Sequence, residues 1–214
     1  MLDAALDKAL EIQRPVVLAY VDRLRADPAA SPADVIAQLE RHYRRAVMGI
    51  GAAAGAAAAV PGAGTATALA SGAAEITAFL SATAMYVLAI AEIHDMPVSD
   101  PQLRRALVLA VLVGESGEAV LAGIAAETPH WATVLGRSAA KERLTGINTQ
   151  LAHLALTRAG ARQGALAVGR ALPLGVGAGI GAAGNATLAR SVIRSARRAF
   201  GPPPARFHGR VIDA

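Results

Sequence analysis

Residues 46–74 read AVMGIGAAAGAAAAVPGAGTATALASGAA, a run that contains no charged side chain and consists mostly of small residues. The run is longer than the about 20 residues that a helix needs to cross a bilayer. The PGAG sequence near its middle interrupts it, because proline removes a helical donor and glycine permits positive φ. We therefore predict a helical hairpin with arms 46–59 and 65–93 whose tip, against or inside a membrane, is formed by Pro61, Gly62 and Gly64.

A second uncharged run, ALPLGVGAGIGAAGNATLA, separates Arg170 from Arg190. Its proline again stands at a turn and is followed by closely spaced glycines and a long helix to Phe200. This pattern predicts a second Pro/Gly-tipped unit with tip residues Pro173, Gly175 and Gly177.

Glycines spaced four apart occur in and near both runs. The pairs are Gly51/Gly55, Gly160/Gly164 and Gly177/Gly181. In lipid, such small residues let helix backbones approach closely. Tight packing in a soluble bundle gives the same spacing, so both interpretations stay open.

The flanking sequence is helical in pattern. Ser31 is a predicted N-cap before Pro32 and Asp34, and an apolar stripe at helical spacing follows. Glu40 and Arg44 are spaced as an i,i+4 ion pair worth about 0.3 kcal/mol.

Further along the chain, Asp100 is a second predicted N-cap, before Pro101. Residues 107–113 are apolar all round and predict a buried helix, and residues 114–117 (GESG) predict its break. The fold class predicted is all-α, a bundle of about six to eight helices with Pro/Gly-tipped, Gly/Ala-rich hairpins.

The 214 residues suit one domain with short extensions. We predict an N-terminal helical extension over residues 1–31, a helical domain over 32–200 and a flexible basic tail over 201–214. The first residues carry acidic side chains and no apolar core, so they do not resemble a secretory signal. We therefore expect this part of the chain in the cytoplasm.

Basic residues gather beside both uncharged runs. The first hundred residues hold 7 Lys/Arg and 11 Asp/Glu, whereas the remaining residues hold 14 and 5. Arginine binds phosphate groups bidentately, and each one near an anionic leaflet contributes about 1 kcal/mol. The predicted headgroup-binding residues are Arg41, Arg44, Arg45, Arg190, Arg194, Arg197 and Arg198.

A solvated helix face is the alternative interpretation of these arginines. Nucleic acid is not predicted as a partner, because Phe200 and Phe207 are the only aromatic side chains near the C-terminal cluster and no known reading element is present.

Catalytic chemistry finds little support in the sequence. The chain has no Cys, no Gly-x-Ser-x-Gly motif and no Walker motif. A carboxylate-bridged metal oxidase is the alternative to consider, but no Glu-x-x-His motif accompanies the carboxylates on the apolar helices. We therefore predict no catalytic residues, no metal site and no cofactor. The carboxylates and histidines weighed for such a site are Glu75, Glu92, Glu115, Glu118, His94 and His153.

Three stretches resemble the EcsC family of bacterial proteins. The first is residues 52–74 with their PGAG tip and the apolar arm 76–93; the second is DPQLRR at 100–105 with the apolar run 106–114; the third is GRALPLGVG at 169–177 with Asn185 and the Arg-rich helix after it. The resemblance covers about residues 32–200. It implies an all-helical, membrane-associated protein, named from an operon that also encodes an ABC transporter, with no enzymatic residues to carry over.

Together these features predict a non-enzymatic structural or interaction protein at the cytoplasmic side of the cell membrane, accessory to a transport or envelope process. Its expected partners are anionic membrane lipids, and a membrane protein complex or a second copy of the chain. The alternative is a soluble helical protein that binds an apolar ligand or lipid in a Gly/Ala-lined cavity. Whether the hairpins span or only enter the bilayer is left open.

Overall fold

The computed structural model describes residues 8–9, 14–58, 65–96, 100–122, 130–132, 135, 144–157 and 176–207. These parts of the chain are all-α and contain no strand, which confirms the predicted fold class. Residues 144–157 are helical as well. The named helices are α2 (Arg14–Leu24), α3 (Pro32–Ala58), α4 (Thr65–Ile93), α5 (Pro101–Val113), α6 (Glu115–Ala122) and α9 (Val176–Phe200).

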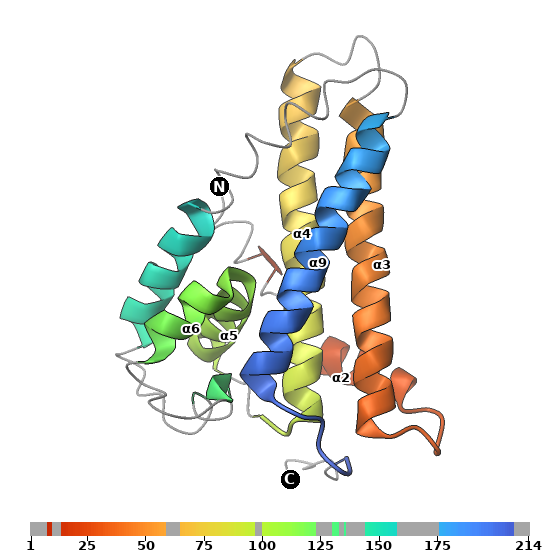
Figure 1. The fold of residues 1–214 in the computed structure, drawn as a ribbon, viewed down its shortest axis with the longest axis vertical. Coiled ribbons are helices and arrows are strands. Elements are labelled where there is room, and N and C mark those ends of the chain that lie inside the picture. Colours follow the sequence, from red (N-terminus) through yellow and green to blue (C-terminus); the bar gives the residue numbers. More distant parts are fainter. Residues whose placement is uncertain are drawn as a thin grey trace.

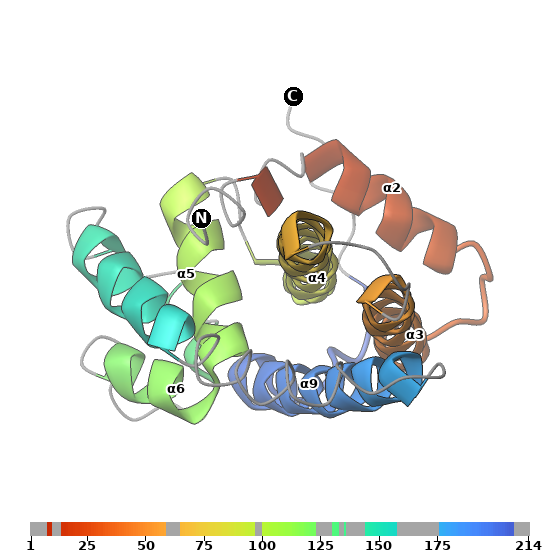
Figure 2. The same ribbon diagram turned by 90° about the horizontal axis from the view of Figure 1, so that it is seen from above.

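The three long helices α3, α4 and α9 run side by side (Figure 1). Helix α3 is antiparallel to the other two, and its contact with α9 is the most extensive between any two named helices. Helix α2 covers α3 and α4 on one side, while α5 and α6 lie on the other (Figure 2). The shorter helices surround only the lower part of the three long ones, so the upper ends of α3, α4 and α9 project beyond them (Figure 1).

Both predicted N-caps are confirmed. At the start of α3, the Asp34 backbone N–H donates to Ser31 Oγ at 3.2 Å, and the Ser31 backbone N–H donates to Asp34 Oδ2 at 3.0 Å. The hydrogen bonds from Ser31 lower the pKa of Asp34 because they favour its charged form. At the start of α5, Asp100 Oδ1 accepts from the Gln102 N–H at 2.8 Å, with Pro101 in the first turn.

Large side chains fill the lower part of the bundle. The rings of Tyr43 and Tyr86 stack with their centroids 4.6 Å apart, and the Tyr43 hydroxyl hydrogen-bonds to Thr83 Oγ1 at 2.9 Å. In α5 the apolar run 107–113 is buried except at Leu112, which is partly exposed, so the predicted buried helix is confirmed. It ends at Gly114, whose φ of 69° favours glycine, so the predicted break between α5 and α6 is confirmed.

The two ends of the described chain meet on the outside of this core. Val17, Val21 and Leu24 bury one face of α2 against the bundle, so the predicted N-terminal extension contributes to the same core as the helical domain. After α9, the described part of the predicted tail runs to Phe207, whose ring lies 4.0 Å below the Arg25 guanidinium. Residues 208–214 of that tail lie outside the described residues.

His94, just after α4, should make stability depend on pH. Burial, and secondarily the nearby His130, lower the pKa of His94 below its ordinary value, because both disfavour the charged ring. The folded state therefore binds fewer protons than the unfolded state just below pH ~6.5, so this stability is present above that pH and is lost as the pH falls through the lowered pKa.

Urea denaturation from neutral pH to about pH 5 measures this loss. We expect His94→Gln to reduce the pH dependence, whereas His153→Gln, which removes an exposed histidine, should leave it as in the wild type. Identical pH profiles for the wild type and His94→Gln would contradict the assignment.

Candidate functional site

A buried asparagine joins the three long helices at one level. Asn185 of α9 is 3% exposed, and its amide nitrogen donates to the Val47 carbonyl of α3 at 3.1 Å and to Glu75 Oε1 of α4 at 3.4 Å. Glu75 is the only charged residue between Arg45 and Glu92. The Asn185 amide thus holds the Glu75 carboxylate at the height along the bundle where the charged part of α3 ends.

Above this junction the three helices carry no charge. The segments concerned are residues 48–58 of α3, 65–74 of α4 and 176–184 of α9, which we call the stalk. At 1.5 Å per residue each segment is about 14–16 Å long. Its described surface is apolar: Met48 is 37% exposed, and Ala53, Ala56 and Ala183 are exposed as well. The stalk is the upper, projecting end of the bundle in Figure 1.

Two of the predicted glycine pairs come level with each other in the stalk. Because α3 and α9 are antiparallel, the residue four positions after Val47 lies level with the residue four positions before Asn185. This register places Gly51 opposite Gly181 and Gly55 opposite Gly177. Gly51 and Gly55 are buried, so small residues let the two helices approach closely along the stalk. The third pair, Gly160/Gly164, lies outside the described residues.

Below the junction, a second bond pins α9 to α3. Arg197 Nε and Nη2 donate to the two carboxylate oxygens of Glu40 at 2.7 Å and 2.6 Å. Glu40 has only 5% of its side chain exposed, whereas Arg197 has 66% exposed. The predicted pairing of Glu40 with Arg44 is therefore wrong: Glu40 faces α9, and the tertiary contact offers a bidentate partner that a neighbour on the same helix does not match.

The remaining arginines lie between the two interhelix bonds. On α3 these arginines lie between Glu40 and Val47, and on α9 they lie between Asn185 and Arg197. At 3.6 residues per turn, Arg44 shares the side of α3 that carries Glu40, and Arg190 shares the side of α9 that carries Arg197. Arg44 and Arg190, from clusters far apart in sequence, thus lie on the sides of two adjacent helices that form the Glu40–Arg197 pair, and the other arginines of the two clusters are exposed between the same two bonds. We call this set the arginine face, and its members are Arg41, Arg44, Arg45, Arg190 and Arg194.

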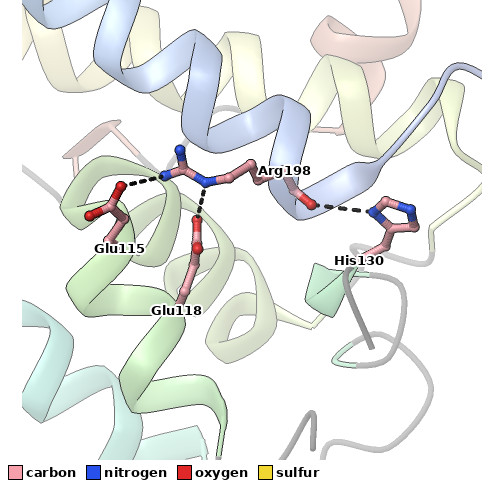
Figure 3. A network of polar contacts seen from close by, with 4 residues as sticks. All are labelled: Glu115, Glu118, His130 and Arg198. Atoms are coloured by element: carbon pink, nitrogen blue, oxygen red, sulfur yellow. Dashed lines mark hydrogen bonds and ion pairs between the residues drawn. The ribbon is translucent and has the colours of Figure 1, made fainter. Parts of the chain in front are cut away.

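Arg198, also predicted to bind headgroups, points toward the acidic side chains of α6 (Figure 3). Its Nε donates to Glu118 Oε1 at 3.0 Å, and its Nη2 lies 3.9 Å from Glu115 Oε1. Its backbone carbonyl accepts a hydrogen bond from His130 Nδ1 at 3.4 Å. Arg198 therefore connects α9 to α6. Within the described parts of the chain, Arg197 and Arg198 form ion pairs with carboxylates, whereas the residues of the arginine face do not.

Burial also shapes the electrostatics near Glu40. The Tyr86 hydroxyl is inaccessible to solvent and has no hydrogen-bond partner among the described residues. Burial, and then the negative charge of Glu40, raise the pKa of Tyr86, and burial raises the pKa of Tyr43 in the same way. Both phenols therefore stay neutral, and neither is poised for acid–base chemistry near neutral pH.

The carboxylates weighed for a metal site do not converge in the described part of the chain. There, no three His, Asp or Glu side chains gather in an arrangement that could hold a metal ion. Glu75 lies at the asparagine junction, while Glu115 and Glu118 contact Arg198.

Most of the predicted hairpin tips fall outside the described residues, namely Pro61, Gly62, Gly64, Pro173 and Gly175. Gly177 is the second residue of α9. Of the described helices, α4 contains one segment, Ala73–Ile93, that is long and apolar enough to cross a membrane, with 56% of its apolar window buried. Core helices of soluble proteins share this length and composition, so the segment does not by itself identify a membrane span.

No family model, curated protein or solved structure matches the chain. The resemblance to the EcsC family stays a prediction.

Residue patterns indicated polar contacts at the asparagine junction without identifying the partners, and gave no signal for the Glu40–Arg197 pair. Asn185 is the one side chain with an amide in an apolar run, and Glu75 is the one charge in another, which are signals of buried polar contacts. The partner of Glu40 lies 157 residues away, beyond any local spacing rule.

The Glu40–Arg197 pair should respond unequally to loss of its two partners. Arg197→Met leaves a buried carboxylate without its donors, so we expect a loss of about 2–3 kcal/mol in the free energy of unfolding. Adding Glu40→Met removes the stranded charge and should recover most of that loss. Urea denaturation of the single and double variants measures both effects. A double variant less stable than Arg197→Met would contradict this account.

Proposed function

We propose that the protein is a non-enzymatic, membrane-associated structural or interaction protein that inserts its stalk into one leaflet and holds anionic headgroups with its arginine face. The observation that carries the proposal is the order of these features along the bundle. An uncharged, small-residue projection begins at the Asn185 junction. Directly below it lie exposed arginines that, among the described residues, form no ion pair of the kind made by Arg197 and Arg198.

The length of the stalk supports insertion into a single leaflet. Its helical segments measure about 14–16 Å, which is about half of the ~30 Å hydrocarbon core of a bilayer. With the stalk inserted to this depth, Asn185 and Glu75 lie at the boundary of the hydrocarbon, where they already satisfy each other. The guanidinium groups of the arginine face then lie among the headgroups, where each contributes about 1 kcal/mol of attraction to anionic lipid.

The same surface fits the proposed partners. Exposed alanines such as Ala53 and Ala56 let another helix approach closely in lipid, which suits either a membrane protein complex or a second copy. Anionic lipids are enriched in the cytoplasmic leaflet, so the arginine face supports the proposed position on the cytoplasmic side. A role accessory to a transport or envelope process follows from the resemblance to the EcsC family.

The arginine face is tested by flotation with vesicles that contain anionic lipid. We expect Arg44→Gln/Arg190→Gln to lower the partition coefficient by about thirtyfold, since two headgroup contacts of about 1 kcal/mol each are lost. The charge-matched control is Lys8→Gln/Arg206→Gln, which removes two exposed cations outside the arginine face. Equal losses for the two pairs would mean that only net charge matters and would overturn the role of this face.

The stalk is tested by washing membranes of expressing cells at high salt and then at alkaline pH. We expect the wild type to stay in the pellet after both washes, because its retention depends on apolar contact with lipid. Ala53→Glu places a charge on the exposed side of the stalk and should release the protein, since charges inside the hydrocarbon are costly. Ala26→Glu, an exposed position on the body, is the control. A wild type found wholly in the soluble fraction would overturn the proposal.

A further inference from the structure

An apolar groove lies beneath α2, on the side of the bundle away from the extensive α3–α9 contact. It has a volume of about 600 Å³ and is lined by α2, α3 and α4. Sites for small ligands commonly enclose about 300–1,000 Å³. The groove is thus large enough for a ligand, and its lining is contributed by helices whose positions the core fixes.

The wall of the groove is hydrophobic and partly open to solvent. Val16, which lines it, is 52% exposed and is the most exposed of the large hydrophobic residues in the described chain. Apolar surface left in contact with water favours a hydrophobic occupant. The other aliphatic side chains along the wall are Ala19 of α2, Leu39 and Ala46 of α3, and Ala82 and Met85 of α4.

The polar groups of the groove are few. The Tyr20 hydroxyl and His42 Nδ1 hydrogen-bond to each other across α2 and α3 at 3.0 Å. Arg23, one turn further along α2, is exposed and is the only formally charged side chain among the described residues of the lining. A long apolar wall with a single cation matches the chemistry of an amphiphile that has one apolar chain and one anionic head.

The position of the groove agrees with a lipid occupant. Ala46 belongs to its wall and immediately follows Arg45 of the arginine face, at the level where the stalk begins. If the stalk is in the bilayer, as in the proposed function, the groove opens at the height of the headgroups. Only this route of entry rests on the proposed function; the fit of the groove to its occupant rests on its volume, wall and charge.

We propose that the groove between α2, α3 and α4 binds the acyl chain of a single-chain anionic lipid, with the chain along the apolar wall and the carboxylate or phosphate head at Arg23. A single chain is inferred because the groove has a volume of about 600 Å³ and its lining provides one cation. Arginine is suited to such a head, since its planar guanidinium donates two parallel hydrogen bonds to carboxylate or phosphate oxygens.

The test is displacement of a fluorescent fatty acid from the full chain by unlabelled saturated carboxylates of increasing length, all below their micellar concentrations. Each added methylene that enters the groove should raise affinity about fourfold. The gain should stop once the chain fills the groove. Alcohols of matched length should bind more weakly, because they lack the charge that Arg23 holds. No saturable displacement, or equal affinity for acid and alcohol, would overturn the proposal.

Two variants locate the binding to this groove. Ala19→Trp fills it from an exposed position on α2 and should weaken binding by about tenfold or more, while Ala29→Trp, exposed in the following turn, should not. Arg23→Gln should abolish the preference for the acid over the alcohol while leaving alcohol binding unchanged. Thermal denaturation of each variant checks that the fold is retained. Unchanged affinity in Ala19→Trp, or an unchanged preference in Arg23→Gln, would overturn the assignment.

These measurements separate the groove from the stalk. Fatty acid binding in solution does not require a bilayer, and retention on membranes after alkaline washing does not require the groove. If Ala53→Glu releases the protein from membranes but leaves fatty acid displacement unchanged, the two sites are independent, as the proposal expects. If Ala19→Trp were to release the protein from washed membranes while displacement stayed unchanged, the groove would be a membrane contact, and the acyl-chain site would be overturned.

Discussion

The antiparallel packing of α3 against α9 is the constraint on which the rest of the structure depends. Two polar contacts fix its register: the Asn185 amide on the Val47 carbonyl, and the Arg197 guanidinium on Glu40. Each contact involves a buried side chain, Asn185 or Glu40, that would be costly to leave unpaired, so a shift of one helix along the other is disfavoured. Apolar contacts between small residues alone would specify this register weakly, because neighbouring alanines and glycines are nearly interchangeable.

This register also decides how charge is distributed along the bundle. Since Asn185 is level with Val47, the uncharged ends of α3 and α9 coincide, and the contact with Glu75 places the end of the uncharged segment of α4 at the same height. The arginines on either side of the uncharged runs are thereby gathered at one level. An amphipathic arrangement along the long axis results, which is a different kind of amphipathicity from the apolar stripe on one side of each helix.

Close packing of small residues and open apolar surface occur in different parts of the molecule. Gly51 and Gly55 are buried in the stalk, whereas the larger side chains of the lower bundle pack around the stacked rings of Tyr43 and Tyr86. Helix α2 packs over the side of the bundle that carries these rings, and the groove lies beneath it. The proposed lipid contacts thus use two features with separate origins, an uncharged projection and an apolar groove beside the core.

The sequence by itself determined the helices: the Ser31 and Asp100 caps, the buried run of α5, the break at Gly114 and the long helix from Thr65 follow from local rules of capping, proline and glycine geometry and apolar periodicity. It also marked the uncharged runs and their arginines. Only the tertiary structure decided which charges are used internally. Glu40 pairs with Arg197 instead of its neighbour Arg44, and Arg198 pairs with Glu115 and Glu118. Local patterns do not predict these pairs because the partners come from elements far apart in the chain. Local spacing carries no information on which helix packs against which. This packing decides which arginines pair with carboxylates of the protein and which belong to the arginine face.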